Sequence, residues 1–588
     1  MPPLYTPLSH PHKEIRLLTL APTYTLTTYP IAIAPPFTAL SYVWGSPTDT
    51  TPITINNTTV HVTKTLATAL RNLRKTLATP LWADAICINQ SSLPERTHQV
   101  QIMHEIYSLA RSVVVYLGSG TKYTDFAMDK MADETFRDRL QRSFDDRTPS
   151  REEVMADVVF KHDLCKRPWW RRLWVRQEFI LSSGDPVFGC GDRFIKWSEL
   201  LECFTSLPRS WDYPGLEGLW AECRKDVTGR EDDAPGTDGI HLISLDMIRD
   251  ESRTRGGLDL FTAVRYVLRN SRATNPLDYV YGLLGVLREE ERRRIRVDYG
   301  VARMELFTKV MEILWTEERG SVVRELLPLL EFCPDGDGFP SWVPDFAAQP
   351  VRGWKDYRCL MADGVLEWPE GMTNTKTSEN HLVIHGIIFD QVKVVLPTPD
   401  AFEQIEELVP VLRQVETAMR EGVELDIPSN HRLRSLETLK FKEGVVHTLT
   451  RSAVEHDEPL FPGLEDSEVL DAFLGRSDLD FSDLGSWDSG VDSQKPMFHR
   501  LTRLLRAKFV ARRALITETG FVGIGVRQIT QGDVVTFPFG GNAPLVLRPR
   551  GNGWAIVGSA YVSGLMEPDR LKKFIDTGLL EPVKFGIL

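Results

Sequence analysis

The chain has 588 residues and a formal net charge of −12, and 42% of its residues are hydrophobic, 26% charged and 9% aromatic. These fractions exclude a mainly disordered, collagenous or coiled-coil chain, and the acidic balance argues against nucleic acid as a partner. Seven scattered cysteines without a Cys-x-x-Cys pair argue against a disulfide framework or a zinc module. No apolar run is long enough for a signal peptide or a membrane span, so we expect a cytoplasmic protein.

The first 190 residues alternate between strand-like and helix-like patterns. Residues 37–43, 81–88 and 112–117 are short apolar runs typical of strands. Between them, residues 64–78 place four leucines at helical spacing, and Ser92 begins a capping box with Glu95 that predicts another helix. Parallel strands need crossover connections, which these helices provide. The pattern therefore predicts an α/β domain with a parallel sheet.

The chain is expected to contain three regions. The α/β domain occupies residues 1–210, and a mostly helical region covers 211–335, with 260–268 and 304–314 as its clearest amphipathic helices. The remaining residues, 336–588, form a mixed C-terminal region.

The C-terminal region is expected to be rich in β-structure at about 379–398 and 513–567, where glycines recur at hairpin spacing. An acidic tract at 465–492 holds nine acids against one arginine, a net −8, and is expected to be mobile. Most of the chain's negative charge therefore belongs to one tract.

Polar residues mark the ends of two predicted strands. In an open α/β sheet, ligands bind outside the carboxyl ends of the strands. A buried polar side chain must be paired, so Ser41 and Asp84 bond to each other, to backbone amides or to a ligand. Two structural alternatives stay open: Asp84 braces the adjacent loop, and Asn89 and Gln90 begin the next helix. The candidate ligand-binding residues at these ends are Ser41, Tyr42, Trp44, Asp84, Asn89 and Gln90.

A tryptophan-rich helix is predicted to begin at Pro168. Trp170, Trp174 and Glu178 are spaced by four, so this helix would carry them on one stripe. A carboxylate against aromatic walls has its charged form disfavoured, which is how a general base or a cation-stabilising carboxylate is tuned. Glu178 is therefore the candidate catalytic residue.

Residues 161–178 carry six Lys or Arg, among them Arg171, against two acids, a local charge of +4 that suits an anionic ligand. The structural alternative is that the tryptophans belong to the core and that Arg172 or Arg176 pairs with Glu178. The sequence shows no metal-binding motif and none of the common P-loop, nucleophile-elbow or metalloprotease motifs.

Four ordered blocks resemble the fungal heterokaryon-incompatibility (HET) domain family: FTALSYVWGS at 37–46, LWADAICINQ at 81–90, ERTHQVQIMHEIYSLA at 95–110 and PWWRRLWVRQE at 168–178. Later runs resemble the flanking regions of long HET-domain proteins, namely RATNPLDYVYGLLG at 272–285, VDYG at 297–300, PSWVPDF at 340–346 and residues 532–566. The resemblance touches most of the chain.

HET domains are thought to be remote relatives of TIR domains, which have a flavodoxin-like sheet and in several cases hydrolyse NAD+ at a glutamate that follows a tryptophan on a helix. The segment from Trp174 to Glu178 looks like that element, with a spacing that differs by one residue. The resemblance implies an NAD+ glycohydrolase that acts in fungal non-self recognition and cell death, with NAD+ as substrate and no cofactor. It makes Glu178 the catalytic carboxylate, Trp174 a pocket wall and Arg171 a substrate contact. Cleavage of the nicotinamide bond passes through an oxocarbenium-like state that a carboxylate stabilises.

Two other function classes stay open. The chain could instead be a non-enzymatic signalling module that self-associates or binds a partner protein, or a sensor that binds a nucleotide without turnover. The tryptophans of residues 168–178 could equally pack an oligomer interface. Nicotinamide release separates the enzyme from both alternatives.

Overall fold

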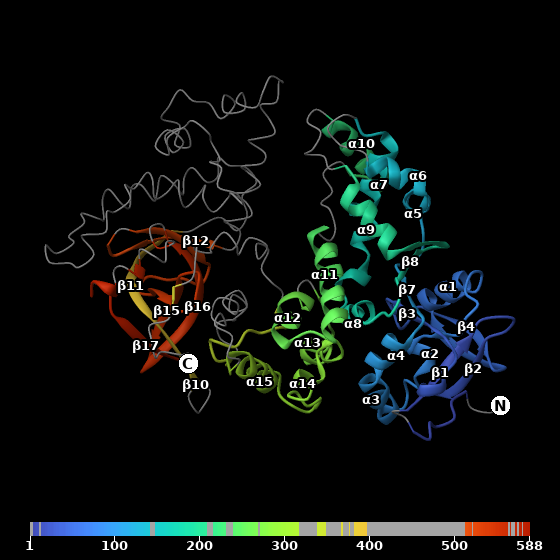
Figure 1. The fold of residues 1–588 in the computed structure, drawn as a ribbon, viewed down its shortest axis with the longest axis horizontal. Helices are drawn as coiled ribbons and strands as arrows, with labels where there is room; N and C mark the ends of the chain where they lie inside the picture. Colours follow the sequence, from blue (N-terminus) through green and yellow to red (C-terminus); the bar gives the residue numbers. More distant parts are fainter. Residues whose placement is uncertain are drawn as a thin grey trace. The chain divides into compact units, whose positions relative to one another are not determined.

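The chain divides into two compact units, Met1–Asp298 and Tyr299–Leu588, in the computed structural model (Figure 1). The residues that it describes are 4–10, 13–141, 148–208, 216–230, 239–268, 271–316, 338–348, 366–367, 375–376, 381–396, 512–519, 521–562, 565, 571–572, 575–578 and 580–588. The predicted acidic tract, 465–492, lies outside them. Among the residues described, no helix combines the length and the apolar character that a membrane crossing requires.

A seven-stranded sheet forms the centre of the first unit. Its strand order is β2-β1-β6-β3-β7-β8-β9, with bounds Thr25–Pro30, Glu14–Thr19, Leu81–Trp82, Thr38–Tyr42, Ser112–Tyr116, Val187–Cys190 and Arg193–Lys196. The inner strands β6, β3, β7 and β8 are parallel, and the outer strands are antiparallel to their neighbours. In chain order the inner strands run second, first, third, fourth, which is the order of flavodoxin-like sheets. Such sheets bind ligands where the order reverses, between the first and third strands. Here that position is the carboxyl ends of β3 and β7.

Helices connect the parallel strands. They are α1 (Lys64–Leu73), α2 (Asp84–Cys87), α3 (Leu93–Gln101), α4 (Met103–Leu109), α5 (Lys122–Ala132), α6 (Glu134–Gln141), α7 (Arg151–His162), α8 (Trp174–Ile180) and α9 (Trp197–Ser206), with 3-10 turns η1 (Ile31–Ile33), η3 (Leu164–Lys166) and η4 (Pro168–Arg171). A hairpin of β4 (Thr50–Ile55) and β5 (Thr58–Thr63) stands between β3 and α1. The predicted α/β organisation with a parallel sheet is therefore confirmed.

Helix α1 shows why the periodic prediction succeeds. The Thr63 side chain accepts a hydrogen bond from the amide of Leu66 and begins the helix. Leu66, Leu70 and Leu73 are fully buried, so the predicted leucine stripe is the face that packs into the unit. Helix α3 begins in a similar way, because the Ser92 hydroxyl accepts the amide of Glu95.

The predicted strand at 81–88 is mostly wrong. Strand β6 contains only Leu81 and Trp82, and helix α2 follows from Asp84. The Asp84 side chain accepts the amide of Ala85 at 2.7 Å, and the amide of Cys87 donates to the carbonyl of Ala83 at 2.7 Å. An acidic residue at the first turn of a helix is favoured by the helix dipole. Asp84 therefore starts a helix and does not lie inside a buried strand.

The single helix predicted from Pro168 is also wrong. The chain forms the 3-10 turn η4, leaves helical geometry at Arg172 and begins α8 at Trp174. The backbone at this break pairs with a later segment, because Arg272 donates its amide to the carbonyl of Arg171 at 2.5 Å and Leu173 donates its amide to the carbonyl of Arg272 at 3.0 Å. The predicted stripe therefore loses Trp170, and only Trp174 and Glu178 share α8.

The middle of the chain is helical, as predicted. Its elements in the first unit are α10 (Glu217–Thr228), α11 (Gly239–Arg255), α12 (Leu260–Thr262), the π-helical turn η6 (Ala263–Val267), α13 (Asp278–Tyr281), η7 (Leu284–Val286) and α14 (Glu289–Arg292). Helix α15 (Arg303–Thr316) belongs to the second unit. The division between the units thus falls inside the region predicted as 211–335.

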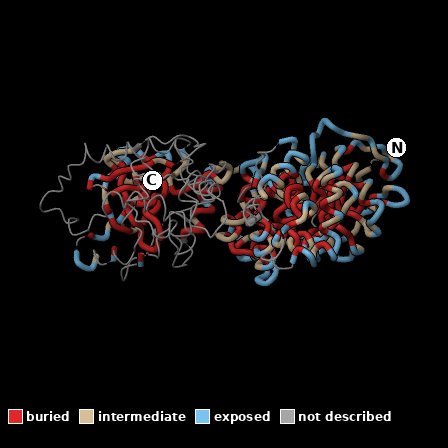
Figure 2. Tube along the Cα trace, turned by 90° about the horizontal axis from the view of Figure 1, so that it is seen from above, coloured by how far each residue is buried: buried red, intermediate tan, exposed pale blue. Residues whose placement is uncertain are grey.

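The second unit contains a closed β-barrel. Six strands pair in a ring, namely β11 (Leu382–Leu396), β12 (Arg512–Thr517), β13 (Val522–Val526), β16 (Gly553–Val562), β15 (Leu545–Arg550) and β14 (Val534–Pro538). β14 pairs with β11 and closes the ring, while β10 (Thr375–Lys376) and β17 (Pro582–Ile587) pair at its margin. Buried residues gather inside this barrel and inside the first unit (Figure 2). The predicted β-rich C-terminal region is confirmed, and β17 extends it beyond the predicted range.

Candidate functional site

Glu178 is buried in the first unit at the face of the sheet. It lies on α8, which packs against β3 and β7, and its exposed fraction is 4%. The pKa of Glu178 is raised to about 7, mainly by burial and also by the nearby Asp84 charge, although Arg172 and hydrogen bonds from the Ser41 and Tyr107 side chains lower it. The Ser41 hydroxyl accepts the indole N–H of Trp169 at 2.7 Å, which leaves its own proton for Glu178. Glu178 can therefore change its charge near neutral pH.

A second carboxylate lies at the same edge of the sheet. Asp84 Oδ2 accepts the indole N–H of Trp44 at 2.8 Å, and Gln90 Nε2 donates to the carbonyl of Asp84 at 2.9 Å. Burial raises the pKa of Asp84, and Arg172, Trp44 and the Tyr42 hydroxyl lower it. Trp44 itself is 37% exposed, so the indole forms the solvent side of this pair.

Arg172 is the cation shared by the two carboxylates. Its guanidinium donates to the carbonyl of Tyr42 at the carboxyl end of β3, and its charge lowers the pKa of both Glu178 and Asp84. Arg172 is half-buried, so its charge acts on both acids through little intervening water. One arginine thus favours the ionised form of each acid.

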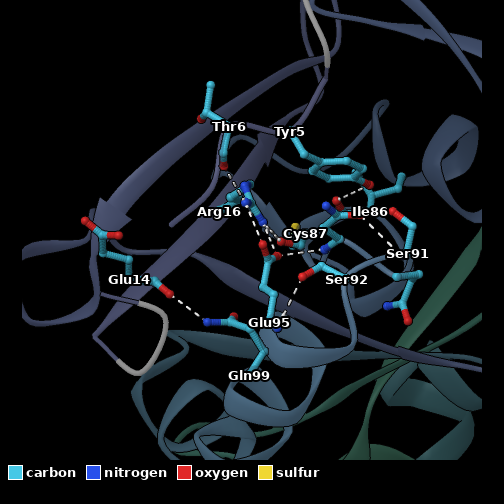
Figure 3. A network of polar contacts seen from close by, with 12 residues as sticks. Tyr5, Thr6, Glu14, Arg16, Ile86, Cys87, Ser91, Ser92, Glu95 and Gln99 are labelled. Carbon is cyan, nitrogen blue, oxygen red and sulfur yellow. Dashed lines mark hydrogen bonds and ion pairs between the residues drawn. The ribbon is translucent and has the colours of Figure 1, made fainter. Parts of the chain in front are cut away.

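A buried ion pair holds the loop that carries Asp84 and Gln90 (Figure 3). Arg16 Nη1 lies 2.5 Å from Glu95 Oε1, and both side chains are almost fully buried. Arg16 Nη1 also donates to the carbonyl of Cys87 at 3.2 Å, and Glu95 Oε1 accepts the amide of Asn89 at 2.8 Å. The pair therefore binds the backbone on both sides of Ile88.

The structure brings most of the predicted residues together. Ser41 contacts Glu178, and Tyr42, Trp44 and Gln90 contact Asp84. We call these residues, together with Arg172 and Tyr107, the polar cluster. The structural alternative for Asp84, that it braces its own loop, also describes part of what is seen, because Gln90 bonds back to it.

Three predicted residues point elsewhere. Trp174 donates its indole N–H to Asp278 Oδ2 at 3.2 Å, and Arg171 is exposed. The Asn89 side chain accepts the hydroxyl and the amide of Ser91 and so shapes a turn. Arg172, and not Arg171, is the arginine of the basic run that lies near Glu178 and Asp84.

Sequence reasoning missed Tyr107 and Trp169, and it named Arg172 only as one of two arginines that could pair with Glu178. Tyr107 belongs to an apolar helical stripe, which is typical of a core position. Trp169 precedes Trp170, and Trp170 is the tryptophan that has the four-residue spacing to Trp174 and Glu178. No spacing rule separates Arg171 from Arg172, because the backbone break at this point decides which side chain turns inward. A polar side chain in an otherwise apolar helical stripe was the one available signal for Tyr107.

The raised pKa of Glu178 predicts a pH dependence of stability. The folded state binds this proton more tightly than the unfolded chain, so the stabilising contribution is complete below about pH 4.5 and is lost as pH rises through about 7. We expect Glu178→Gln to match the wild type at pH 5 and to be more stable by roughly 3 kcal/mol at pH 8. Urea denaturation followed by tryptophan fluorescence at both pH values measures the difference. Equal differences at the two pH values would contradict the prediction.

Comparisons with known proteins confirm the resemblance to the HET family. Residues 37–178 match the family model "Heterokaryon incompatibility protein (HET)", and residues 495–573 match the "Het-6 beta-barrel domain". The chain is 24% identical to "Heterokaryon incompatibility protein 6, OR allele" of Neurospora crassa, over 95% of each chain. No solved structure matches the chain. The first match begins at the start of β3 and ends at Glu178, so it contains the whole polar cluster.

Proposed function

We propose that the first unit of this heterokaryon-incompatibility-type chain is TIR-like and hydrolyses NAD+, releasing nicotinamide and ADP-ribose or its cyclic form. The observation that supports this is Glu178, a buried carboxylate with a pKa of about 7 at the strand ends where a flavodoxin-ordered sheet binds ligands. This reaction removes NAD+ from the cell and is the effector step of non-self recognition and cell death. The protein acts in the cytoplasm.

The chemistry requires one negative charge beside the ribose. The bond between ribose C1′ and the nicotinamide nitrogen breaks, and its electron pair leaves with nicotinamide. Ionised Glu178 stabilises the positive ribose carbon and accepts a proton from the water that adds to C1′. Arg172 favours the ionised forms of Glu178 and Asp84, and its bond to the carbonyl at the end of β3 holds its guanidinium near them.

Trp44 provides the exposed aromatic surface of the polar cluster. Its indole N–H is held by Asp84, so one ring face is available to stack on a nucleotide base or on nicotinamide. We expect Trp44→Ala to raise the KM for NAD+ about tenfold, since stacking on an aromatic side chain contributes about 1–3 kcal/mol. Trp44→Phe keeps the ring, loses the bond to Asp84 and serves as the matched comparison. An unchanged KM in Trp44→Ala would show that this ring does not contact the substrate.

Glu178 is only 4% exposed, so a substrate reaches it only after the side chains that cover it move. This burial also favours the second candidate function, a sensor that binds a nucleotide without turnover. Mixing the full chain with NAD+ and following nicotinamide by chromatography separates the two. Nicotinamide release supports hydrolysis, whereas calorimetric binding of NAD+ without release supports the sensor. Neither binding nor release, in any assembly state of the protein, would contradict both.

A further inference from the structure

Helix α8 packs both against the sheet and against elements that follow it much later in the chain, from α11 to η7. On one side it packs against β3 and β7, and on the other against α11 and η7. Figure 1 shows α11 beside α8. These later elements lie outside the region that matches the HET family model. We call residues 249–268 and 271–287 the bracket.

The bracket binds the start of α8. The amide of Leu173 donates to the carbonyl of Arg272 at 3.0 Å. The indole of Trp174, the first helical residue, donates to Asp278 Oδ2 at 3.2 Å. The backbone entry into α8 and its first side chain are thus both fixed by residues of the bracket.

The middle of α8 is packed too closely against the bracket to admit a side chain. A Cβ atom at Gly285 would overlap Gln177 Oε1, and a Cβ atom at Gly282 would lie 3.0 Å from Leu173 Cδ2. Arg176 is buried and donates to Ser271 Oγ at 3.3 Å. Burial lowers the pKa of Arg176 to about 9, and among the residues that the structure describes no carboxylate offsets this cost.

Two arginines of α11 bind the segment that directly follows α8. Arg249 donates to Ser182 Oγ at 3.1 Å and to the carbonyl of Gly184. Arg253 donates to the carbonyls of Ser182 at 2.8 Å, Ser183 and Gly184 at 3.2 Å. These bonds fix the backbone that leaves α8, and cations beyond the C-terminal end of a helix complement its dipole.

We infer that the bracket positions Glu178, with Asp278, Gly285, Arg249 and Arg253 as positioning residues for its carboxylate. A seven-residue helix is too short to be stable by itself, so contacts at its two ends and its middle determine where it lies. A small shift of α8 moves the Glu178 carboxylate away from the Ser41 and Tyr107 hydroxyls and from Arg172. The catalytic consequence rests on the proposed function, whereas the positional consequence does not.

The test compares Asp278→Asn and Gly285→Ala with a matched control in the full chain. Asp157→Asn is the control, because Asp157 also accepts an indole N–H, that of Trp220 at 3.1 Å, but on α7. Hydrogen exchange of the peptide covering 172–184 is expected to accelerate about tenfold or more in both bracket variants, with exchange of β7 unchanged. Asp157→Asn is expected to leave residues 172–184 as in the wild type. Since Asp278→Asn conserves shape, it remains informative if Gly285→Ala does not fold.

Infrared titration of the Glu178 carboxyl, assigned by its loss in Glu178→Gln, gives a readout that simple destabilisation would not move. We expect the apparent pKa of Glu178 to change by about one unit in Asp278→Asn and to stay constant in Asp157→Asn. Unchanged exchange and an unchanged titration in both bracket variants would overturn the inference, as would equal changes in Asp157→Asn. Neither measurement uses NAD+, so a wild type without nicotinamide release would contradict the proposed function and leave this inference tested separately.

Discussion

Glu178→Gln is expected to lower kcat for nicotinamide release by at least about a hundredfold, because glutamine keeps the shape of the side chain but carries no negative charge for the developing ribose cation. The KM for NAD+ is expected to change little, since the charge is needed in the transition state and not for binding. Steady-state nicotinamide release measured by chromatography gives both constants. Loss of binding together with turnover would instead assign Glu178 to substrate binding.

The pH profile of the wild type supports or opposes the same assignment. Catalysis by the ionised form requires kcat/KM to rise as pH increases through about 7, the pKa of Glu178. A profile that falls over this range would assign Glu178 as a proton donor. Glu105→Gln, at an exposed position of α4, is the control and is expected to keep wild-type activity. Wild-type kcat in Glu178→Gln would refute the catalytic assignment.

Arg16→Met is expected to destabilise the first unit by about 3–5 kcal/mol, because it leaves the buried Glu95 carboxylate without its cation. The carbonyls of Thr6 and Cys87 lose a donor in the same variant. Urea denaturation of the full chain, followed by fluorescence, measures the change. The double variant Arg16→Met, Glu95→Leu removes both charges and is expected to recover part of the loss.

A matched surface pair provides the control for this prediction. Lys64 and Asp49 also form an ion pair at 2.5 Å, but their side chains are 64% and 55% exposed. Lys64→Met is expected to cost less than about 1 kcal/mol, because solvent screens exposed pairs. Similar losses in Lys64→Met and Arg16→Met would show that burial of the Arg16 pair does not determine its contribution.

The sequence pattern correctly predicted the elements whose own residues determine which side is buried. Strands β3 and β7 are rich in apolar residues and almost wholly buried, and α1 buries the leucine stripe that its spacing predicts. The run at 81–88 failed because its apolar composition fits a strand or a buried helix equally well, and the bond between Asp84 and Ala85 selects the helix. The edge strand β2 was missed since five of its six residues are threonine, tyrosine or proline exposed to different degrees, without a clear alternation.

The candidate site was predictable up to the point where distant residues decide it. Ser41, Asp84 and Glu178 follow from polar residues in apolar surroundings, and the structure places them in one cluster. The direction of Trp174 was not predictable, because its partner Asp278 lies more than a hundred residues later. A second long-range contact, the backbone bonds of Arg171 and Leu173 to Arg272, lies at the break of the helix at Arg172. The Arg172 side chain bonds there to the end of β3, near both acids.

The bracket has a consequence for chimeras of this chain with related chains. A crossover between residues 178 and 249 would join an α8 from one parent to Arg249, Asp278 and Gly285 from another. Because a side chain at Gly285 would displace the Gln177 amide, such chimeras are expected to be less stable unless both parents share this packing. Chimeras that exchange the first 298 residues together keep the contacts between α8 and the bracket of one parent. We therefore expect this segment to be exchanged without loss of stability only as a whole.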